Sequence, residues 1–265
     1  MATVPKTQYN TFAPKYASLE GEVPFSKLEA QLVDLALGDC SGLTILDLGG
    51  GNGGPARRAV EAGAAVVDVV DISAEMLRVG RETEARLGRQ GRIRWFEADV
   101  TRPLATQQVT AADGGDGLRA DGYDIVMANW LFDHATSLAD LEGMWANIVS
   151  YLRPGGRFLG IRSLNVYAEH MSASSAKYGL CLTHIEKIPG GVKYMVDCRV
   201  QPPFSFEATS MESTYLRIDD IPRRLGLVDF AVIDPKDTEA VKEDPEFWDD
   251  FVKDPSCGVV VARKP

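Results

Sequence analysis

The stretch TILDLGGGNGGP, residues 44–55, decides the fold. Apolar and β-branched residues lead to a carboxylate, Asp47, and glycines then follow more densely than an ordinary turn requires. Where a strand ends in a glycine-rich turn and the chain re-enters as a helix, backbone N–H groups are exposed, and the missing Cβ atoms let a ligand lie against the main chain. The stretch therefore predicts a site for an elongated polar ligand.

Two nucleotide-site patterns overlap in this turn. The pattern G-x-G-x-x-G over residues 49–54 is the dinucleotide fingerprint, and Asp71 follows at the distance expected for an acid that binds ribose. The pattern D-x-G-x-G-x-G over residues 47–53 differs, because an acid closes the strand and the glycines alternate. The glycines alone do not choose between the two ligands.

Composition favours one globular domain that acts on a small molecule. The chain has 265 residues, 45% of them hydrophobic and 25% charged, which are ordinary globular values. Its formal net charge of −10 argues against nucleic acid, since sites for a phosphate backbone need clustered Lys and Arg. A small-molecule substrate fits this charge better.

Cysteine usage and the absence of long apolar runs predict a cytoplasmic location. The four cysteines have no metal-ligand spacing, so we expect free thiols in a reducing compartment and no metal site. No apolar run approaches the roughly 20 residues of a membrane span, and the first residues lack the apolar segment of a signal peptide. The cysteines are Cys40, Cys181, Cys198 and Cys257.

From residue 43 onward, apolar segments of strand length alternate with segments of helical period. This alternation predicts a parallel sheet with helices on both faces. Ser26, Ser73 and Ser137 are the expected helix N-caps, and Asp219 or Asp220 is expected to cap a short later helix. Residues 105–121 break the rhythm, and we expect an exposed loop without a chemical role. The expected strands are 43–48, 66–71, 92–97, 123–128, 157–162, 192–200, 227–233 and 258–263.

The flanking segments suggest four parts of one domain. The aromatic-rich insertion after the fifth strand lies at the ligand edge of such a sheet, which favours a substrate cap over a structural or dimer-forming insertion. Aromatic residues in the N-terminal arm either cover the ligand or anchor the N-terminus. The four parts are the arm and first helix (1–42), the ligand-binding core (43–162), the inserted cap (163–214) and the C-terminal part of the sheet (215–265).

Five motifs in order resemble the class I S-adenosylmethionine-dependent methyltransferases, and most closely their small-molecule branch of quinone and natural-product enzymes. The resemblance covers residues 43–162 and implies a doubly wound, Rossmann-like α/β fold, with a seven-stranded sheet and a reversed last strand. The motifs are D-x-G-x-G-x-G at 47–53, Asp71-Ile72-Ser73-x-x-Met76-Leu77, Ala98-Asp99-Val100, Tyr123-Asp124-Ile125-Val126 and Leu152-Arg153-Pro154-Gly155-Gly156.

The resemblance also implies roles for single residues in binding S-adenosylmethionine. Gly49, Gly51 and Gly53 would let the backbone approach the methionine part of the cofactor, and Asp47 would help to hold its amino group. Asn129, just past the fourth strand, would place its backbone carbonyl near the same ammonium.

The other half of the cofactor has its own implied residues. Asp71 would accept from both ribose hydroxyls, and Ile72 would pack against adenine. Asp99 would accept from the adenine amino group, with Val100 beside it.

The chemistry of the cofactor agrees with this set of acids. S-adenosylmethionine is cationic at sulfur and at nitrogen, whereas an acid immediately before the glycines would repel a pyrophosphate. None of the eight tyrosines has a lysine four residues later, a pair that many dehydrogenases use. An NAD-dependent oxidoreductase and a catalytically silent methyltransferase-fold regulator remain the alternatives.

Methyl transfer is an in-line displacement, so an enzyme can act largely by orienting the reactants. A base is needed only for an acceptor that is protonated until attack. His134 is the candidate base, because an unperturbed histidine titrates near neutrality, and a packing role is the alternative. Trp130 follows Asn129 where amide and base methyltransferases have Pro-Pro-aromatic, and the acceptor atom stays open among O, N, S and C. The candidate substrate contacts are Tyr9, Tyr16, Trp130, His170 and Tyr178, with His184 as a further candidate base.

Overall fold

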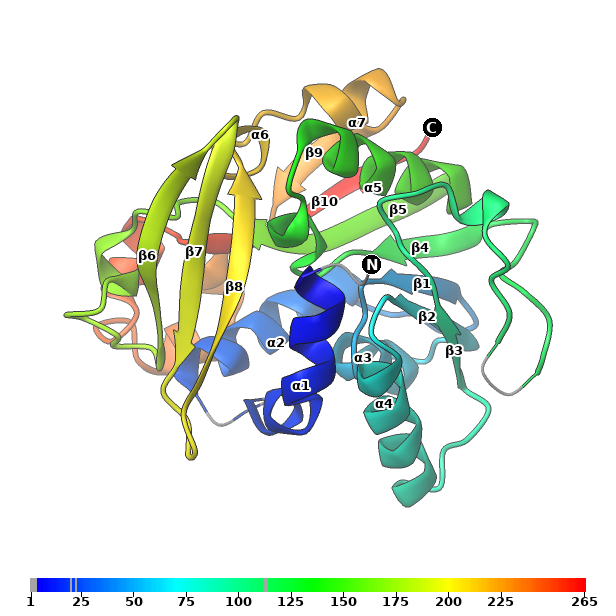
Figure 1. Cartoon of the computed structure of the whole chain (residues 1–265), viewed down its shortest axis with the longest axis horizontal. Helices are drawn as coiled ribbons and strands as arrows, with labels where there is room; N and C mark the ends of the chain where they lie inside the picture. The colour runs from blue at the N-terminus through cyan, green and yellow to red at the C-terminus, as the bar shows by residue number, and fades with distance from the viewer. Residues whose placement is uncertain (1–3, 20, 22, 112–113) are drawn as a thin grey trace.

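A seven-stranded sheet forms the centre of the molecule. This computed structural model describes residues 4–19, 21, 23–111 and 114–265, within which the sheet has the order β3-β2-β1-β4-β5-β10-β9 (Figure 1). Strands β1 to β5 run parallel, and β10 is antiparallel to both of its neighbours, so the predicted fold is confirmed. The strands are β1 (Thr44–Leu48), β2 (Val66–Asp71), β3 (Ile93–Glu97), β4 (Tyr123–Met127), β5 (Leu152–Ser163), β9 (Val228–Val232) and β10 (Cys257–Arg263).

Each face of the large sheet carries its own apolar core, because successive strand side chains point to opposite faces. In β1, Ile45 packs into the core under α2, α3 and α4, whereas Leu46 packs into the core under α5 and α7. The result is the expected arrangement of helices on both faces. The helices are α2 (Pro24–Leu37), α3 (Gly54–Glu61), α4 (Ala74–Arg86), α5 (Leu138–Tyr151), α7 (Asp220–Arg224), α8 (Glu239–Glu243) and α9 (Asp249–Lys253).

Two of the predicted helix caps are confirmed, the one at Ser26 is wrong, and Asp219 occupies the N-cap position without a side-chain hydrogen bond to the helix. The hydroxyls of Ser73 and Ser137 accept from the backbone N–H three residues later, as N-caps do. Ser26 lies inside α2, which begins at Pro24, because proline suits the first turn of a helix. Asp219 precedes α7, but its carboxylate accepts from Arg162 instead of capping the helix.

A second, smaller sheet is inserted between β5 and α6 (Glu212–Tyr215). It has three antiparallel strands in the order β6-β7-β8 and stands at the left of Figure 1. The expected strand at 192–200 is β7, paired with β6 through the turn at Gly190, as a hairpin after that glycine predicts. The other two strands were not predicted, because polar and apolar residues mix along them. The strands are β6 (Leu180–Ile188), β7 (Gly191–Cys198) and β8 (Phe204–Met211).

The N-terminal arm forms helix α1 (Val4–Leu19), which connects the small sheet to the large one (Figure 1). Gln8 exchanges two hydrogen bonds with the backbone of Glu207 in β8, at 3.0 and 2.7 Å. Two residues further along, Asn10 Oδ1 accepts from Ser73 Oγ at 2.7 Å, beside the start of α4. The arm therefore packs between β8 and the start of α4, next to the carboxyl end of β2.

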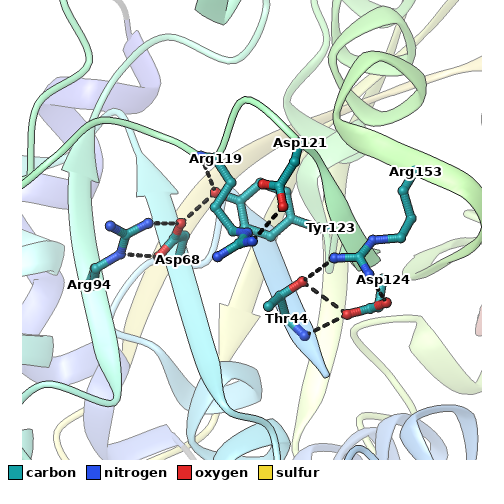
Figure 2. Close-up of polar contacts among 8 residues, drawn as sticks. All are labelled: Thr44, Asp68, Arg94, Arg119, Asp121, Tyr123, Asp124 and Arg153. Carbon is teal, nitrogen blue, oxygen red and sulfur yellow. Dashed lines mark hydrogen bonds and ion pairs between the residues drawn. The ribbon is translucent and has the colours of Figure 1, made fainter. Parts of the chain in front are cut away.

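Near the amino ends of its strands, the large sheet is held by paired charges (Figure 2). Asp68 is fully buried and accepts from both Arg94 and the Tyr123 hydroxyl. Asp124 pairs with Arg153 at 2.7 Å and also accepts from Thr44. These contacts satisfy the carboxylates of this edge within the protein itself.

The cysteine prediction is confirmed, because all four thiols are free and buried. None of the helices in the described ranges combines the length and the apolar character that crossing a membrane requires.

Candidate functional site

The glycine-rich turn lies directly on the carboxylate that precedes it. Gly51 has a φ of +54°, which side-chain-bearing residues rarely adopt, and an added Cβ would lie 2.9 Å from Cε of Met76. A Cβ on Gly50 would lie only 2.6 Å from Asp47 Oδ2. The turn can therefore pass this close to its neighbours only without side chains.

Asp47 is a buried carboxylate that has no partner. Its side chain is completely buried, and neither carboxylate oxygen has a hydrogen-bond donor among the described residues. Burial, and secondarily the charge of Asp71, raises the pKa of Asp47 to about 8. Because an unsatisfied buried acceptor is costly, a ligand that brings donors or positive charge would complete the site.

Asn129 supplies a second unpartnered polar group at the same sheet edge. It follows β4, which pairs with β1, and its Oδ1 accepts from the N–H of Ile161 at 3.2 Å. Its Nδ2 is buried and has no acceptor within the described ranges. Unsatisfied polar groups thus lie at the carboxyl ends of two adjacent strands.

Asp71, at the end of β2, is held in place by backbone donors. Its two oxygens accept from the N–H groups of Gly51 at 2.9 Å and Ser73 at 2.8 Å. Burial raises its pKa to about 6, although these hydrogen bonds act in the opposite direction. Each carboxylate oxygen keeps a second lone pair, so hydroxyl groups of a ligand can still be bound. Ile72 follows directly and is half-buried.

Asp99, after β3, is bonded locally. Its Oδ1 accepts from the N–H and the hydroxyl of Thr101 at 3.0 and 2.7 Å, and Val100 beside it is buried. The amide of Gln107 forms two hydrogen bonds with the Asp99 backbone, at 3.1 and 2.8 Å. The loop at 105–121, which was expected to be exposed and without a chemical role, thus contacts the site through Gln107, which holds the backbone of Asp99.

An interior cavity lies between α1, α2, the small sheet and the carboxyl end of β4. Tyr9, Tyr16, Trp130 and His134, four of the predicted substrate and catalytic residues, line it together. Its volume of about 70 Å³ is far below the roughly 300–1,000 Å³ of typical ligand pockets. An acceptor therefore enters only if α1 or the small sheet shifts.

A larger groove adjoins this cavity. The two share His134 and Ala208, and the groove has a volume of about 680 Å³. Lys193 and Glu207, which form an ion pair at 2.7 Å, lie among its lining residues. The groove has room for the body of a small molecule whose reactive end reaches the cavity.

His134 is half-buried and packs against the N-terminal arm. Its Nε2 and the Tyr9 hydroxyl share a hydrogen bond of 2.9 Å, and the two rings meet edge to face. Burial lowers the pKa of His134 to about 4, so the imidazole is neutral at physiological pH. A neutral imidazole can accept a proton, but this low pKa makes it a weak base.

Trp130 is held in a strained conformation beside Asn129. Its φ of +59° is unusual for a bulky residue, and such strain tends to occur at functional sites. Phe25 stacks on its ring, and its indole N–H donates to Glu29 Oε1 at 2.7 Å. The ring is therefore fixed as one wall of the cavity.

His170 and Tyr178, predicted as substrate contacts, do not reach the cavity. Tyr178 is fully buried, stacks on Trp248 and donates its hydroxyl to the carbonyl of Phe247. His170 packs against Tyr178 in the same aromatic cluster. Both belong to the contact between the insertion and the C-terminal segment, so we correct these two assignments. His184 is exposed on β6 and is not among the cavity residues.

Sequence reasoning missed two carboxylates that line the cavity. Asp133 is buried and accepts from the Tyr194 hydroxyl at 3.1 Å and from the Ser163 N–H at 3.3 Å. Glu29 lies one helical turn from Phe25, on the apolar side of α2. A charged residue within that apolar stripe was the signal that could have identified it.

In the comparison with known proteins, the family match falls within the segment predicted as the ligand-binding core, residues 43–162. Residues 46–158 match a family described as methyltransferase domain. The chain is 29% identical over 136 residues to squalestatin tetraketide synthase of Cochliobolus lunatus, and 28% identical over 161 residues to ribosomal protein L11 methyltransferase of Laribacter hongkongensis. The aligned parts cover 49% and 60% of this chain but 5% and 45% of those proteins, so the chain spans less than half of their length.

Solved structures share the fold over almost the whole chain. The CcbJ methyltransferase from Streptomyces caelestis superposes with a TM-score of 0.61, covering 99% of this chain and 98% of that chain at 16% identity. The domain match and the shared fold agree with the resemblance that the five sequence motifs carry.

Proposed function

We propose that this chain, a class I S-adenosylmethionine-dependent methyltransferase, transfers a methyl group to an O, N, S or C atom of a small molecule that binds in the interior cavity and the adjoining groove. The family and its cofactor rest on the domain match and the fold. One observation supports the activity most directly: the unpartnered carboxylate of Asp47 lies under the glycine-rich turn. A cationic amino-acid end is the ligand that this carboxylate lacks.

The residues at the sheet edge fit S-adenosylmethionine. Asp47 would hold its ammonium group, and Asp71 would accept from the ribose hydroxyls. Asp99, with Ile72 and Val100 nearby, would bind the adenine. When bound, the cofactor supplies a methyl carbon that becomes bonded to the acceptor atom while its bond to sulfur breaks, and the electron pair stays on sulfur.

The cavity residues would orient the acceptor and keep water out. Tyr9, Tyr16 and Trp130 form aromatic walls beside Asn129, and π faces favour the positive charge near the reacting carbon. His134 would accept a proton only from an acceptor that is easily deprotonated, because its pKa is low. We further propose that residues 163–214, which contain the small sheet, act as the cap that selects the acceptor.

Charge and thiol chemistry support the remaining parts of the proposal. The net charge of −10 favours a small-molecule acceptor over nucleic acid. The four free thiols support a reducing, cytoplasmic location. An NAD-dependent oxidoreductase loses support, since a pyrophosphate at the turn would meet the carboxylate of Asp47.

Methyl transfer is tested with the purified chain, methyl-labelled S-adenosylmethionine and a metabolite extract, with products identified by mass. We expect one or a few small molecules to gain a labelled methyl group, and much less transfer with Asp71→Ala at the same cofactor concentration. Binding of S-adenosylmethionine without transfer to any acceptor would favour the silent binding protein. Binding of NAD in its place would overturn the proposal.

A further inference from the structure

We propose that the acceptor carries a basic amine and that Glu29 binds it as an ammonium group. This inference rests on the proposed function and specifies the substrate class for the same cavity. It starts from the side chains that line the cavity and from which of them already have partners.

Glu29 is a cavity carboxylate with unused hydrogen-bonding capacity. Its Oε1 accepts from the Trp130 indole N–H at 2.7 Å. Among the described residues, this is the side chain's one hydrogen bond. An ionised carboxylate offers about four lone-pair sites, so Oε2 can receive a donor from a ligand. Burial raises the pKa of Glu29 to about 8, although the Trp130 hydrogen bond acts in the opposite direction.

The other carboxylate in the cavity is already satisfied. Asp133 accepts from Tyr194 and from the backbone of Ser163, and these bonds link the small sheet to the end of β5. Asp133 therefore serves the packing of the fold, whereas Glu29 faces the cavity with an oxygen to spare.

The residues that line the cavity include no lysine or arginine in the described ranges. His134 is neutral because of its low pKa, so the described side chains that line the cavity supply no cation to Glu29. An acceptor with a carboxylate or phosphate at this point would place an uncompensated negative charge beside Glu29 in a medium of low dielectric constant. An ammonium group would instead favour the ionised form of Glu29.

The walls of the cavity suit the same ligand. Phe25 and Trp130 stack with centroids 6.4 Å apart, and Tyr9 and Tyr16 meet edge to face at 5.8 Å. Aromatic faces attract cations, and aliphatic side chains such as Leu180 and Val196 form another part of the lining. The chemistry therefore fits an apolar molecule with one amine.

The competing explanation is that Glu29 only positions the Trp130 ring. Glu29→Gln separates the two, because the glutamine amide oxygen still accepts from the indole N–H while the charge is lost. Glu186→Gln is the matched control, since Glu186 undergoes the same change at an exposed place on β6 outside the cavity. Thermal unfolding of each variant checks that the fold is kept.

The test uses three probes of one length: 3-phenylpropylamine, 3-phenylpropan-1-ol and 3-phenylpropanoate. Calorimetry measures their binding to the wild type and both variants, with and without S-adenosylhomocysteine. We expect the wild type and Glu186→Gln to bind the amine at least about tenfold more tightly than the alcohol, as a charge-assisted hydrogen bond does. Glu29→Gln should lose this preference and keep its affinity for S-adenosylhomocysteine.

Equal affinity of the wild type for amine and alcohol, or no measurable binding of the amine, would overturn the inference. An amine preference that survives in Glu29→Gln would also overturn it. If Glu29→Gln lost only its affinity for S-adenosylhomocysteine, Glu29 would belong to the cofactor site, and the inference would again be wrong. Failure of the wild type to bind S-adenosylhomocysteine would contradict the proposed function instead. The titrations of the three probes without S-adenosylhomocysteine would still show whether the cavity prefers the amine.

Discussion

Two fully buried aspartates on adjacent strands, Asp47 in β1 and Asp68 in β2, differ in one respect. Asp68 accepts from Arg94 and Tyr123, near the edge where the strands begin (Figure 2). Asp47, near the edge where they end, has no donor among the described residues. Burying a charge is tolerated when it is paired, so the paired aspartate serves the fold, and the unpaired one indicates a ligand.

The strongest test of this comparison is the pH dependence of stability in the absence of cofactor. The pKa of Asp47 is about 8 in the folded protein against 3.8 ordinarily, so only the folded state binds this proton between those values. The wild type should therefore lose several kcal/mol of stability as the pH rises from about 4 to about 8. A tenfold difference in proton affinity between the folded and unfolded states corresponds to about 1.4 kcal/mol.

Asp47→Asn removes this titrating group, so its free energy of unfolding should fall less over the same range. Urea denaturation at a series of pH values measures both proteins. If their stabilities fall in parallel, Asp47 is not the uncompensated charge that the comparison requires.

Asp68→Ala should lower the stability of the fold without changing the affinity for the ligand. Removing one member of a buried ion pair leaves Arg94 and Tyr123 without their partner, and we expect a loss of about 3–5 kcal/mol in the free energy of unfolding. The folded fraction should bind S-adenosylmethionine as the wild type does, as calorimetry at low temperature can measure. If Asp68→Ala lowered the free energy of unfolding by less than about 1 kcal/mol, Asp68 would not stabilise the fold as the comparison with Asp47 requires.

Asp71→Ala should act on the ligand more than on stability. The carboxylate would accept from both ribose hydroxyls, and hydrogen bonds to a charged group are worth about 1.5–3 kcal/mol, so S-adenosylmethionine binding should weaken well over tenfold. Asp121→Ala is the control, since it removes an exposed carboxylate at the other edge (Figure 2). Unchanged affinity in Asp71→Ala would remove this residue from the cofactor site.

His134→Ala should have the smallest effect and is the sharpest test of a catalytic role. Turnover with a saturating acceptor should fall about tenfold, less than the roughly 100-fold or more that is typical of proton transfer, because a pKa of about 4 makes the imidazole a weak base. Affinity for S-adenosylmethionine should stay within about twofold of the wild type. Tyr9→Phe keeps the packing and removes the hydrogen bond to His134, and activity unchanged in both variants would make the pair structural.

The motif residues could be placed from the sequence because parallel strands end at one edge of a sheet. Asp47, Asp71 and Asp99 each follow or close a strand, so their common edge follows from the alternation of strands and helices. The helix N-caps at Ser73 and Ser137 could also be predicted from the sequence, since a cap depends on residues within one turn.

The cavity could not be placed in the same way, because its contacts join residues far apart in the chain. Glu29 meets Trp130 across 101 positions, and Gln8 meets Glu207 across 199. The aromatic content of the insertion was visible, but not the side toward which each ring points, so His170 and Tyr178 were assigned to the wrong place.

The sequence by itself determined the parallel sheet, the acids at its strand ends and the family resemblance, because these depend on local period and on spacing within short motifs. Only the tertiary structure decided which buried polar groups find partners. Asp68 and Asp133 are satisfied by side chains from other elements, whereas Asp47 and Glu29 keep acceptor oxygens for a ligand. That difference arises from packing. The sequence shows which residues carry a carboxylate, whereas the side chains that pack against each carboxylate are known only from the tertiary structure.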